Sequence, residues 1–453
     1  MSDITYGKPI PVDPDGVHKD TVARLLLADG VDADDNLINP QPITDPVDVP
    51  AGKVVAFQAG VRNQPPKPPT SEWPEFAWNP DNYNNTVEVN DNLADALRAM
   101  GEGNNLIVLH ERCIPQLAAI FADDPMLLWN HNFTARPDEF RQHALTFRCI
   151  KPMKFPGLQG FHITNPGGLG LAFTSTGSLN LRCNLISKCG QGIVVTSAGS
   201  NMSIRSQFNR YDEFLDFTRP QAVYITRGPF YSEEDVFSQV GHLRGDSRPS
   251  GSHLNHAIYA HLDAAVTVRN SFFADTDSHG INARGNTSIN GIVCVRNATG
   301  IGIGHKEPNP SIEGIVHRAI IANMEDLDDT KLGVGIASEQ STITISNSII
   351  ADERSAGEGS AIRLYDRGHV RFNGGVRVQG MSRAIDVSGA YCSANGTLIT
   401  DGATTNLVNK RPSSSNFSGS VKRTVSEPIA LPDFDFMPYP EPGTVGALID
   451  SVL

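Results

Sequence analysis

The sequence predicts an all-β chain folded as a parallel β-helix, a solenoid in which successive turns of the chain stack on one another. A recurring five-residue phrase supports this prediction: apolar, any, apolar, polar, then Asn or a small residue. It occurs at residues 179–183, 202–206, 266–270, 293–297 and 343–347. Alternation with period two is typical of a strand with one buried face, and recurrence at intervals of roughly 20–30 residues is typical of a repeat architecture.

A second phrase, Gly or Ala followed by Ile and two strand-forming residues, recurs between copies of the first. It occurs at residues 192–195, 257–260, 280–283, 300–303, 361–364 and 384–387. One turn of such a chain cannot bury its apolar side alone, so the turns must stack into a continuous core. An Asn at a corner can hydrogen-bond the backbone of the bend. The alternative, an antiparallel sandwich, predicts a hairpin turn every 8–12 residues or so and no recurring phrase.

The composition is that of a turn-rich β protein and argues against some partners. The chain has 453 residues, with 41 Gly, 30 Pro and a net charge of −13, which disfavours binding to nucleic acid through phosphates. Its cysteines are scattered without CxxC spacing, which indicates reduced thiols, with Cys183 on an inward strand phase and Cys294 on the opposite one. No signal peptide or membrane-spanning segment is recognisable, so we expect no membrane insertion and no signal-directed export.

Residues 1–85 form a front region with a different character, and we expect it to be a small, irregular anchoring domain. It is rich in Pro and Asp, with one expected helix at 21–29, one expected strand at 54–58 and a Pro-rich spacer at 64–69. Proline-rich segments of this kind are semi-rigid. Trp73, Phe76 and Trp78 beside the spacer either dock onto a partner or pack against the rest of the chain.

We expect the solenoid to extend over residues 86–405, with a helix at its start and a tail at its end. Residues 92–100 predict a short amphipathic helix and 105–109 a strand, and a helix there would plug the first turn and protect its strand edges. The Ser- and Pro-rich residues 408–442 predict an extended tail over the last turns, within a capping segment of residues 406–453.

The gap between the second and third copies of the first phrase predicts an insert at about residues 207–255. It is rich in aromatic and charged residues, and loops that leave a rigid solenoid commonly carry its recognition surface. Tyr211, Phe230 and Tyr231 are therefore candidate sugar-binding residues. The alternative is that the aromatic side chains of the insert simply pack against the solenoid.

A group of histidines follows this insert. His256 and His279 each stand two residues before the Ile of the second phrase, so on adjacent turns they would be about 4.8 Å apart. With His261 and His305 they are further candidates for glycan binding.

Nearby side chains suggest chemistry on a sugar. Asp275, Asp277 and His279 offer an acid and a base, and Arg284 offers a clamp for a sugar carboxylate, so these four are the candidate catalytic residues. The alternative is structural, because polar side chains commonly satisfy the backbone of β-helix turns. The spacings match no metal-binding pattern and no cofactor motif, so we expect neither a metal nor a cofactor.

Taken together, the expected helix at 92–100, the repeats from Ile193 to Ile385 and the acidic front region resemble phage tailspike and tail-fibre proteins. These belong to the pectate-lyase-like superfamily of right-handed parallel β-helices. The resemblance covers roughly residues 90–405 and rests on the repeat pattern.

The resemblance implies a homotrimeric virion protein that attaches to other virion proteins through its N-terminal domain. It also implies recognition of a host cell-surface polysaccharide, with or without depolymerase activity as a glycosidase or lyase. Two alternatives stay open: a free polysaccharide lyase or glycosidase of a bacterium, and a structural virion component without catalysis.

Overall fold

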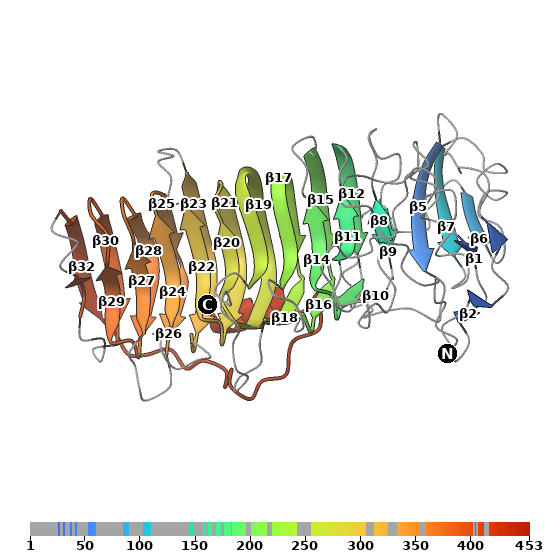
Figure 1. Cartoon of the computed structure of the whole chain (residues 1–453). Helices are drawn as coiled ribbons and strands as arrows, with labels where there is room; N and C mark the ends of the chain where they lie inside the picture. Colours follow the sequence, from blue (N-terminus) through green and yellow to red (C-terminus); the bar gives the residue numbers. More distant parts are fainter. Residues whose placement is uncertain are drawn as a thin grey trace. The chain divides into compact units, whose positions relative to one another are not determined.

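The structure is a computed structural model in which the chain forms two compact units, Met1–Phe217 and Thr218–Leu453. It is predominantly parallel β-sheet with almost no helix (Figure 1). It describes side chains for residues 170–171, 180–182, 184–195, 203–214, 220–241, 255–304, 312–324, 333–352, 359–401, 404, 406–411 and 416–453. Outside these ranges it describes the backbone of strands only.

The first unit consists of short strands that pair mainly in parallel. Two small antiparallel pairs, β1 (Leu26–Leu27) with β4 (Gln41–Pro42) and β2 (Gly30–Val31) with β3 (Leu37–Ile38), are the exceptions. The remaining strands are β5 (Lys53–Ala59), β6 (Asn85–Val89), β7 (Gly103–Leu109), β8 (Leu145–Phe147), β9 (Gly157–Gln159), β10 (His162–Thr164), β11 (Leu169–Phe173), β12 (Thr176–Arg182), β13 (Leu185–Ser187), β14 (Gln191–Val195), β15 (Asn201–Gln207) and β16 (Arg210–Asp212).

Two sequence-based expectations for this unit are confirmed and one is wrong. The expected strands at 54–58 and 105–109 are parts of β5 and β7, which pair in parallel along their whole length. The expected helix at 21–29 is wrong where the backbone is described, because Leu26–Leu27 form strand β1. The expected plug helix at 92–100 lies outside the described residues.

The second unit is a stack of parallel strands that follow one another in chain order (Figure 1). They are β17 (Gln221–Glu233), β18 (Val236–Val240), β19 (His256–Thr276), β20 (His279–Ala283), β21 (Thr287–Val295), β22 (Thr299–Gly304), β23 (Glu313–Ala322), β24 (Val334–Glu339), β25 (Thr342–Ser346), β26 (Ser348–Ala351), β27 (Ser360–Leu364), β28 (His369–Gln379), β29 (Arg383–Val387), β30 (Ser393–Thr400), β31 (Asn409–Lys410) and β32 (Ser418–Val425). This arrangement is compatible with the expected β-helix.

The strand register of this unit aligns buried residues into three columns. Column A contains Val223, Ile258, Ile281, Ile301, Ile336, Ile362 and Ile385. Column B contains Val268, Ile289, Val316, Ile345 and Phe372. Column C contains Phe237, Phe273, Cys294, Ile321, Ile350 and Val378. The second phrase of the sequence therefore marks one continuous stack, column A, as its regular spacing predicts.

The small residue that precedes each Ile of column A has a steric reason. A Cβ atom added to Gly300 would lie 2.7 Å from the carbonyl oxygen of Gly335 and 3.0 Å from Ile321 Cγ2 of column C. Gly280 and Gly335 are hemmed in by the next strand in the same way. The phrase Gly/Ala–Ile is thus a packing rule, because columns A and C approach each other at this corner.

The first phrase does not mark a single column. Residues 266–270 and 343–347 contribute to column B, but in residues 293–297 the inward residue is Cys294 of column C, which has no exposed surface. The expected outward phase of Cys294 is therefore wrong. Val293 and Val295 point away from column C and are buried by a different part of the chain, described below.

Asparagine side chains do bond the corner backbone, as the sequence predicts. Asn297 Oδ1 accepts a hydrogen bond from the Thr276 amide at 2.8 Å. In the first unit, Asn209 donates to the Leu181 carbonyl at 2.9 Å and accepts from the Asn184 side chain at 2.9 Å. These amides replace water at bends that are fully buried.

The expected loop-like insert at 207–255 is largely regular sheet where the structure describes it. Strands β16, β17 and β18 fall within it, and Phe237 stacks on Phe273 of column C with 4.6 Å between ring centroids. Column A continues through this stretch as Ala222-Val223, in which Val replaces the Ile of the Gly/Ala–Ile phrase and is one methylene group smaller. Phe208, Tyr211, Phe214, Phe230 and Phe237 are buried and fill the core, whereas Tyr224 and Tyr231 of the same stretch point outward.

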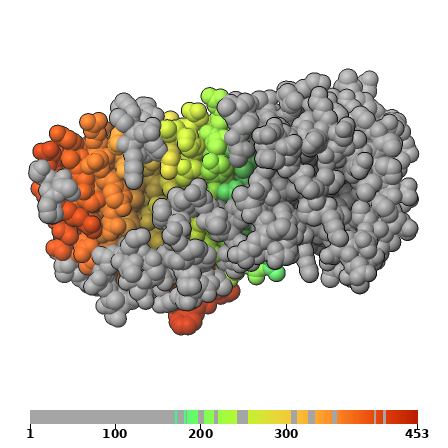
Figure 2. All heavy atoms as spheres, in the orientation of Figure 1, coloured from blue at the N-terminus to red at the C-terminus, as the bar shows by residue number. Residues whose placement is uncertain are grey.

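The C-terminal residues 426–453, here called the strap, run back along the second unit (Figure 1), and part of this C-terminal segment is visible at the lower edge of the space-filling view (Figure 2). They follow β32 and end in helix α4 (Val445–Val452). Residues 426–444 contain no helix or strand and have turns at 434–436 and 442–443, and their position differs from the expected one. Instead of covering the last strands alone, the strap reaches β19, β21 and β23, and residues 418–425 form strand β32.

Candidate functional site

An aromatic and polar cluster lies on the outward side of the strands of column A. Tyr224 and Tyr259 follow Val223 and Ile258 directly in sequence, so their side chains leave the sheet on the side opposite the core. Their rings are parallel, with centroids 5.4 Å apart and an interplanar angle of 8°. His256 continues the stack, with its ring 5.3 Å from that of Tyr259 at 12°.

The two histidines predicted to stack are adjacent in the structure. His256 and His279 are in register on β19 and β20, and their rings meet edge to face with centroids 5.0 Å apart. Ser278 Oγ lies 2.7 Å from His279 Nδ1, and Asn282 Nδ2 lies 3.2 Å from His256 Nε2. The expected neighbourhood is confirmed, although the rings are perpendicular instead of parallel.

Arg284 supplies the positive charge of this cluster. Its guanidinium carbon lies 5.0 Å from the centroid of the Tyr259 ring, in a cation–π arrangement. Burial raises the pKa of Tyr259, and the positive charge of Arg284 offsets part of that increase. Tyr259 is therefore neutral at physiological pH and serves as a hydroxyl and an aromatic ring. Half-buried Tyr224, Asn282, Arg284 and His279 form the accessible part of the cluster.

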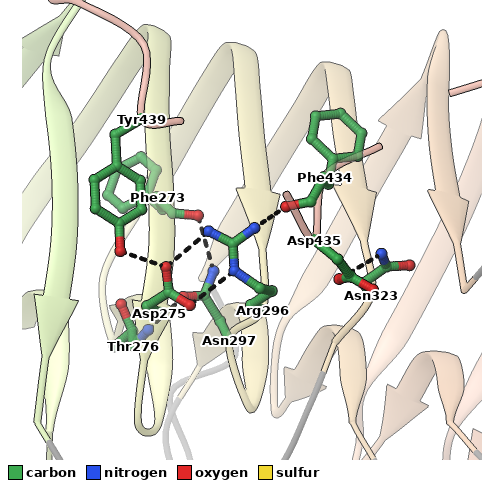
Figure 3. Close-up of polar contacts among 9 residues, drawn as sticks. All are labelled: Phe273, Asp275, Thr276, Arg296, Asn297, Asn323, Phe434, Asp435 and Tyr439. Carbon is green, nitrogen blue, oxygen red and sulfur yellow. Dashed lines mark hydrogen bonds and ion pairs between the residues drawn. The ribbon is translucent and has the colours of Figure 1, made fainter. Parts of the chain in front are cut away.

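The predicted catalytic carboxylates have other partners. Asp275 receives two hydrogen bonds from Arg296, both 2.8 Å long, and one from the Tyr439 hydroxyl at 2.7 Å (Figure 3). Asp277 is buried and accepts a hydrogen bond from Asn255 at 2.7 Å. Of the four candidate catalytic residues, the described contacts place His279 and Arg284 in the aromatic cluster and Asp275 beneath the strap.

The predicted glycan-binding residues divide by exposure. Tyr211 and Phe230 have no exposed surface and belong to the cores of their units, so their rings are not available to a ligand at the surface of the chain. Tyr231 points the other way along β17 and is 43% exposed. His256 is in the cluster, His261 lies half-buried in β19, and His305 lies outside the described residues.

Sequence reasoning missed Tyr224, Tyr259 and Asn282. A signal was present, because each directly follows a residue of column A and therefore occupies one outward column. This signal was obscured at Tyr224 because the residue before it is Val223, whereas the second phrase has Ile at that position. At the next level this outward column contains Gly302, and a Cβ there would lie 2.9 Å from His279 Cδ2.

Together, the cluster can stack on the apolar face or edge of a sugar and hydrogen-bond its hydroxyl or carboxylate groups. Among the described side chains, no group of three His, Cys, Asp or Glu residues is placed to hold a metal ion. No helix in the described part of the chain has the length and apolarity needed to cross a membrane.

Comparisons with known proteins add no identification: no family model matches the sequence, and neither the curated proteins nor the solved structures yield a match.

Proposed function

We propose that the second unit is a right-handed parallel β-helix that binds a polysaccharide at the Tyr224–Arg284 cluster. The observation that carries this proposal is the juxtaposition, on the outside of the paired strands β17, β19 and β20, of stacked tyrosines with an arginine, an asparagine and two histidines. Aromatic rings with adjacent hydrogen-bond donors suit sugars, which present apolar C–H faces and a rim of hydroxyl groups. The parallel strand stacking is compatible with the β-helical part of the proposal.

The resemblance to phage tailspike and tail-fibre proteins supplies the biological setting of the proposal. In that setting the chain is a homotrimeric virion protein, anchored to other virion proteins by its N-terminal region, and the polysaccharide is on the host surface. Binding is proposed ahead of cleavage because Asp275 is held by Arg296 and Tyr439 and Asp277 is buried against Asn255.

The test is a binding assay of the full-length protein against a panel of bacterial capsule and lipopolysaccharide polymers, with polymer length followed in parallel. We expect one polymer to bind and Arg284→Ala to weaken its binding by about tenfold or more, the loss of a charged hydrogen-bond donor. Arg367→Ala is the matched control, because Arg367 also lies over a tyrosine ring, that of Tyr391 at 5.9 Å, outside the cluster.

Three results would contradict the proposal: no polymer binds, Arg284→Ala binds like the parent, or Arg367→Ala loses as much affinity as Arg284→Ala. Shortening of the bound polymer would add a depolymerase activity, and new unsaturated ends would identify it as a lyase.

A further inference from the structure

The strap covers a side of the second unit that would otherwise expose apolar residues. The outward residues of the column C strands include Val236, Phe272, Ala274, Val293, Val295, Ile320 and Ala322, all of them buried. Phe434, Val445 and Ile449 of the strap are buried against them, with Leu431, Met437, Tyr439, Leu448 and Val452 partly buried around them. Burial of this face depends on strap residues, because the same strands already use their inward residues in the core.

Polar contacts hold the strap along both edges of this face. At one edge, Asn323 donates to Asp435 at 3.0 Å, Arg296 donates to the Phe434 carbonyl, and Tyr439 donates to Asp275 (Figure 3). At the other edge, Glu234 Oε2 accepts from the amides of Val445 and Gly446 at 3.1 and 3.2 Å, and Arg318 pairs with Asp450. Further along, Gln379 exchanges two hydrogen bonds with the Ile429 backbone.

The backbone of the edge residues is unusual. Glu234, Asp275, Arg296, Arg318 and Asn323 all have φ between 52° and 56°, in the left-handed region, and so does Gln239 at 53°. Residues other than glycine are uncommon in this region of backbone conformation. On other strands the equivalent corner positions contain Gly291, Gly375 and Gly380, or asparagine, which also tolerates positive φ, at Asn270 and Asn347. All six non-glycine residues contact the strap, Gln239 through a hydrogen bond with Tyr439. Their side chains thus have a use that glycine could not provide.

The docking surface is composite, since these residues lie in or directly beside the strands from β17 to β23 and are aligned only by the parallel register of those strands. The strap therefore has no complete partner until those strands have stacked. We propose that the strap docks last, onto strands that have already stacked. In that position it slows the unfolding of the second unit and takes no part in the nucleation of folding. Interactions that form after the transition state change the unfolding rate and leave the folding rate nearly unchanged.

Phe434 and Phe436 provide a matched pair for the test. Both are strap phenylalanines, but Phe434 has no exposed surface and Phe436 is 86% exposed. We expect Phe434→Ala to raise the unfolding rate of the full chain by about tenfold or more and to change the refolding rate less than about twofold. Phe436→Ala should change neither rate. Unfolding and refolding rates are measured after rapid jumps to high and low denaturant concentration. The change in β-sheet content is followed by far-UV circular dichroism.

The proposal is overturned if Phe434→Ala slows refolding as much as it speeds unfolding, or if the two variants behave alike. Should Phe434→Ala fail to fold, Glu234→Ala is the second variant, because it removes the acceptor for the first two amides of α4 and leaves the apolar residues of the strap in place. It should speed unfolding alone, whereas Glu233→Ala, which removes an ion pair to exposed Arg269, should not. Failure of both Phe434→Ala and Glu234→Ala to fold would also overturn the proposal, since the strap would then be needed for folding itself.

Discussion

Asp275 shows how one residue can be read as catalytic from sequence and have a different role in the fold. Its carboxylate sits at a corner with φ of 54°, between Arg296 and Tyr439. Burial by itself would lower the pKa of Arg296, but the hydrogen bonds and charge of Asp275 raise it, so the guanidinium stays charged. Burial, followed by the charge of Asp275, raises the pKa of Tyr439 and keeps its hydroxyl protonated as a donor. The carboxylate therefore organises a corner that joins the sheet to the strap.

We expect Asp275→Asn to lower the free energy of unfolding by about 2 kcal/mol, the size of a hydrogen bond to a charged group. Asparagine is nearly isosteric and tolerates positive φ, so the loss reports the charge and not backbone strain. The midpoint of guanidinium denaturation at constant m value measures it.

Asp263→Asn is the control for this substitution. Asp263 pairs with Arg227 at 3.7 Å, and the side chains are 65% and 49% exposed, so solvent screens that pair and its loss should be within about 0.5 kcal/mol. Equal effects of the two substitutions would show that Asp275 contributes no more than a surface charge.

At the scale of the strand, the isoleucines of column A show why the repeat is regular. Ile281, Ile301 and Ile336 each lie in register with their neighbours in the column, and they have no exposed surface. Three facing columns leave little space, which is also why Gly or Ala must precede each of them. A stack of identical β-branched residues fills such a narrow core with few rotamers to restrict.

Replacing one isoleucine of this stack should strongly destabilise the fold, because the strand register prevents its neighbours from moving into the space that is left. We expect Ile301→Ala to lower the free energy of unfolding by about 3 kcal/mol, combining lost burial with a residual cavity. Ile315→Ala is the control, since Ile315 is 52% exposed on the neighbouring strand β23 and should lose less than about 0.5 kcal/mol. Thermal or denaturant unfolding of the two variants measures both losses. Similar losses of unfolding free energy for Ile301→Ala and Ile315→Ala would mean that column A is not a close-packed core.

Across the whole molecule, the sequence pattern predicts the inward residues of column A correctly. It does not predict which residues point inward around column C, where both faces of the strands are buried. Column A was predictable because its apolar residues have a fixed spacing and phase. Around column C the phase is lost, since inward Phe273 and Cys294 alternate with outward Phe272 and Val293, which the strap buries. A strand buried on both faces is a continuous apolar run, so periodicity cannot say which residues face the core.

The candidate site was predictable to the same extent. His256 and His279 were paired correctly from their position relative to the column A isoleucines. Tyr224 and Tyr259 were missed because a tyrosine after a buried residue looks like an ordinary strand residue until the register aligns it with its neighbour. The contact of Asp275 with Tyr439 joins residues 164 positions apart, and no local pattern can predict it.

The buried thiols provide a probe of how the second unit opens. Burial raises the pKa of both Cys294 and Cys392, so neither forms the reactive thiolate while the fold is intact. Cys294 belongs to column C beneath the strap-covered strands, whereas Cys392 precedes β30, the last strand but one of its stack, where it donates to the Tyr365 carbonyl. In stacked architectures the terminal repeats have fewer neighbours and open first.

We therefore expect iodoacetamide to label Cys392 about tenfold or more faster than Cys294 under native conditions, with the peptides resolved by mass spectrometry. The chemistry at the two sulfur atoms is the same, so a difference in rate reports a difference in opening free energy. Equal rates would mean that the unit opens in a single cooperative event, with no contribution from position in the stack. A faster reaction at Cys294 would mean that the strap face opens before the end of the stack, contrary to the order that its contacts predict.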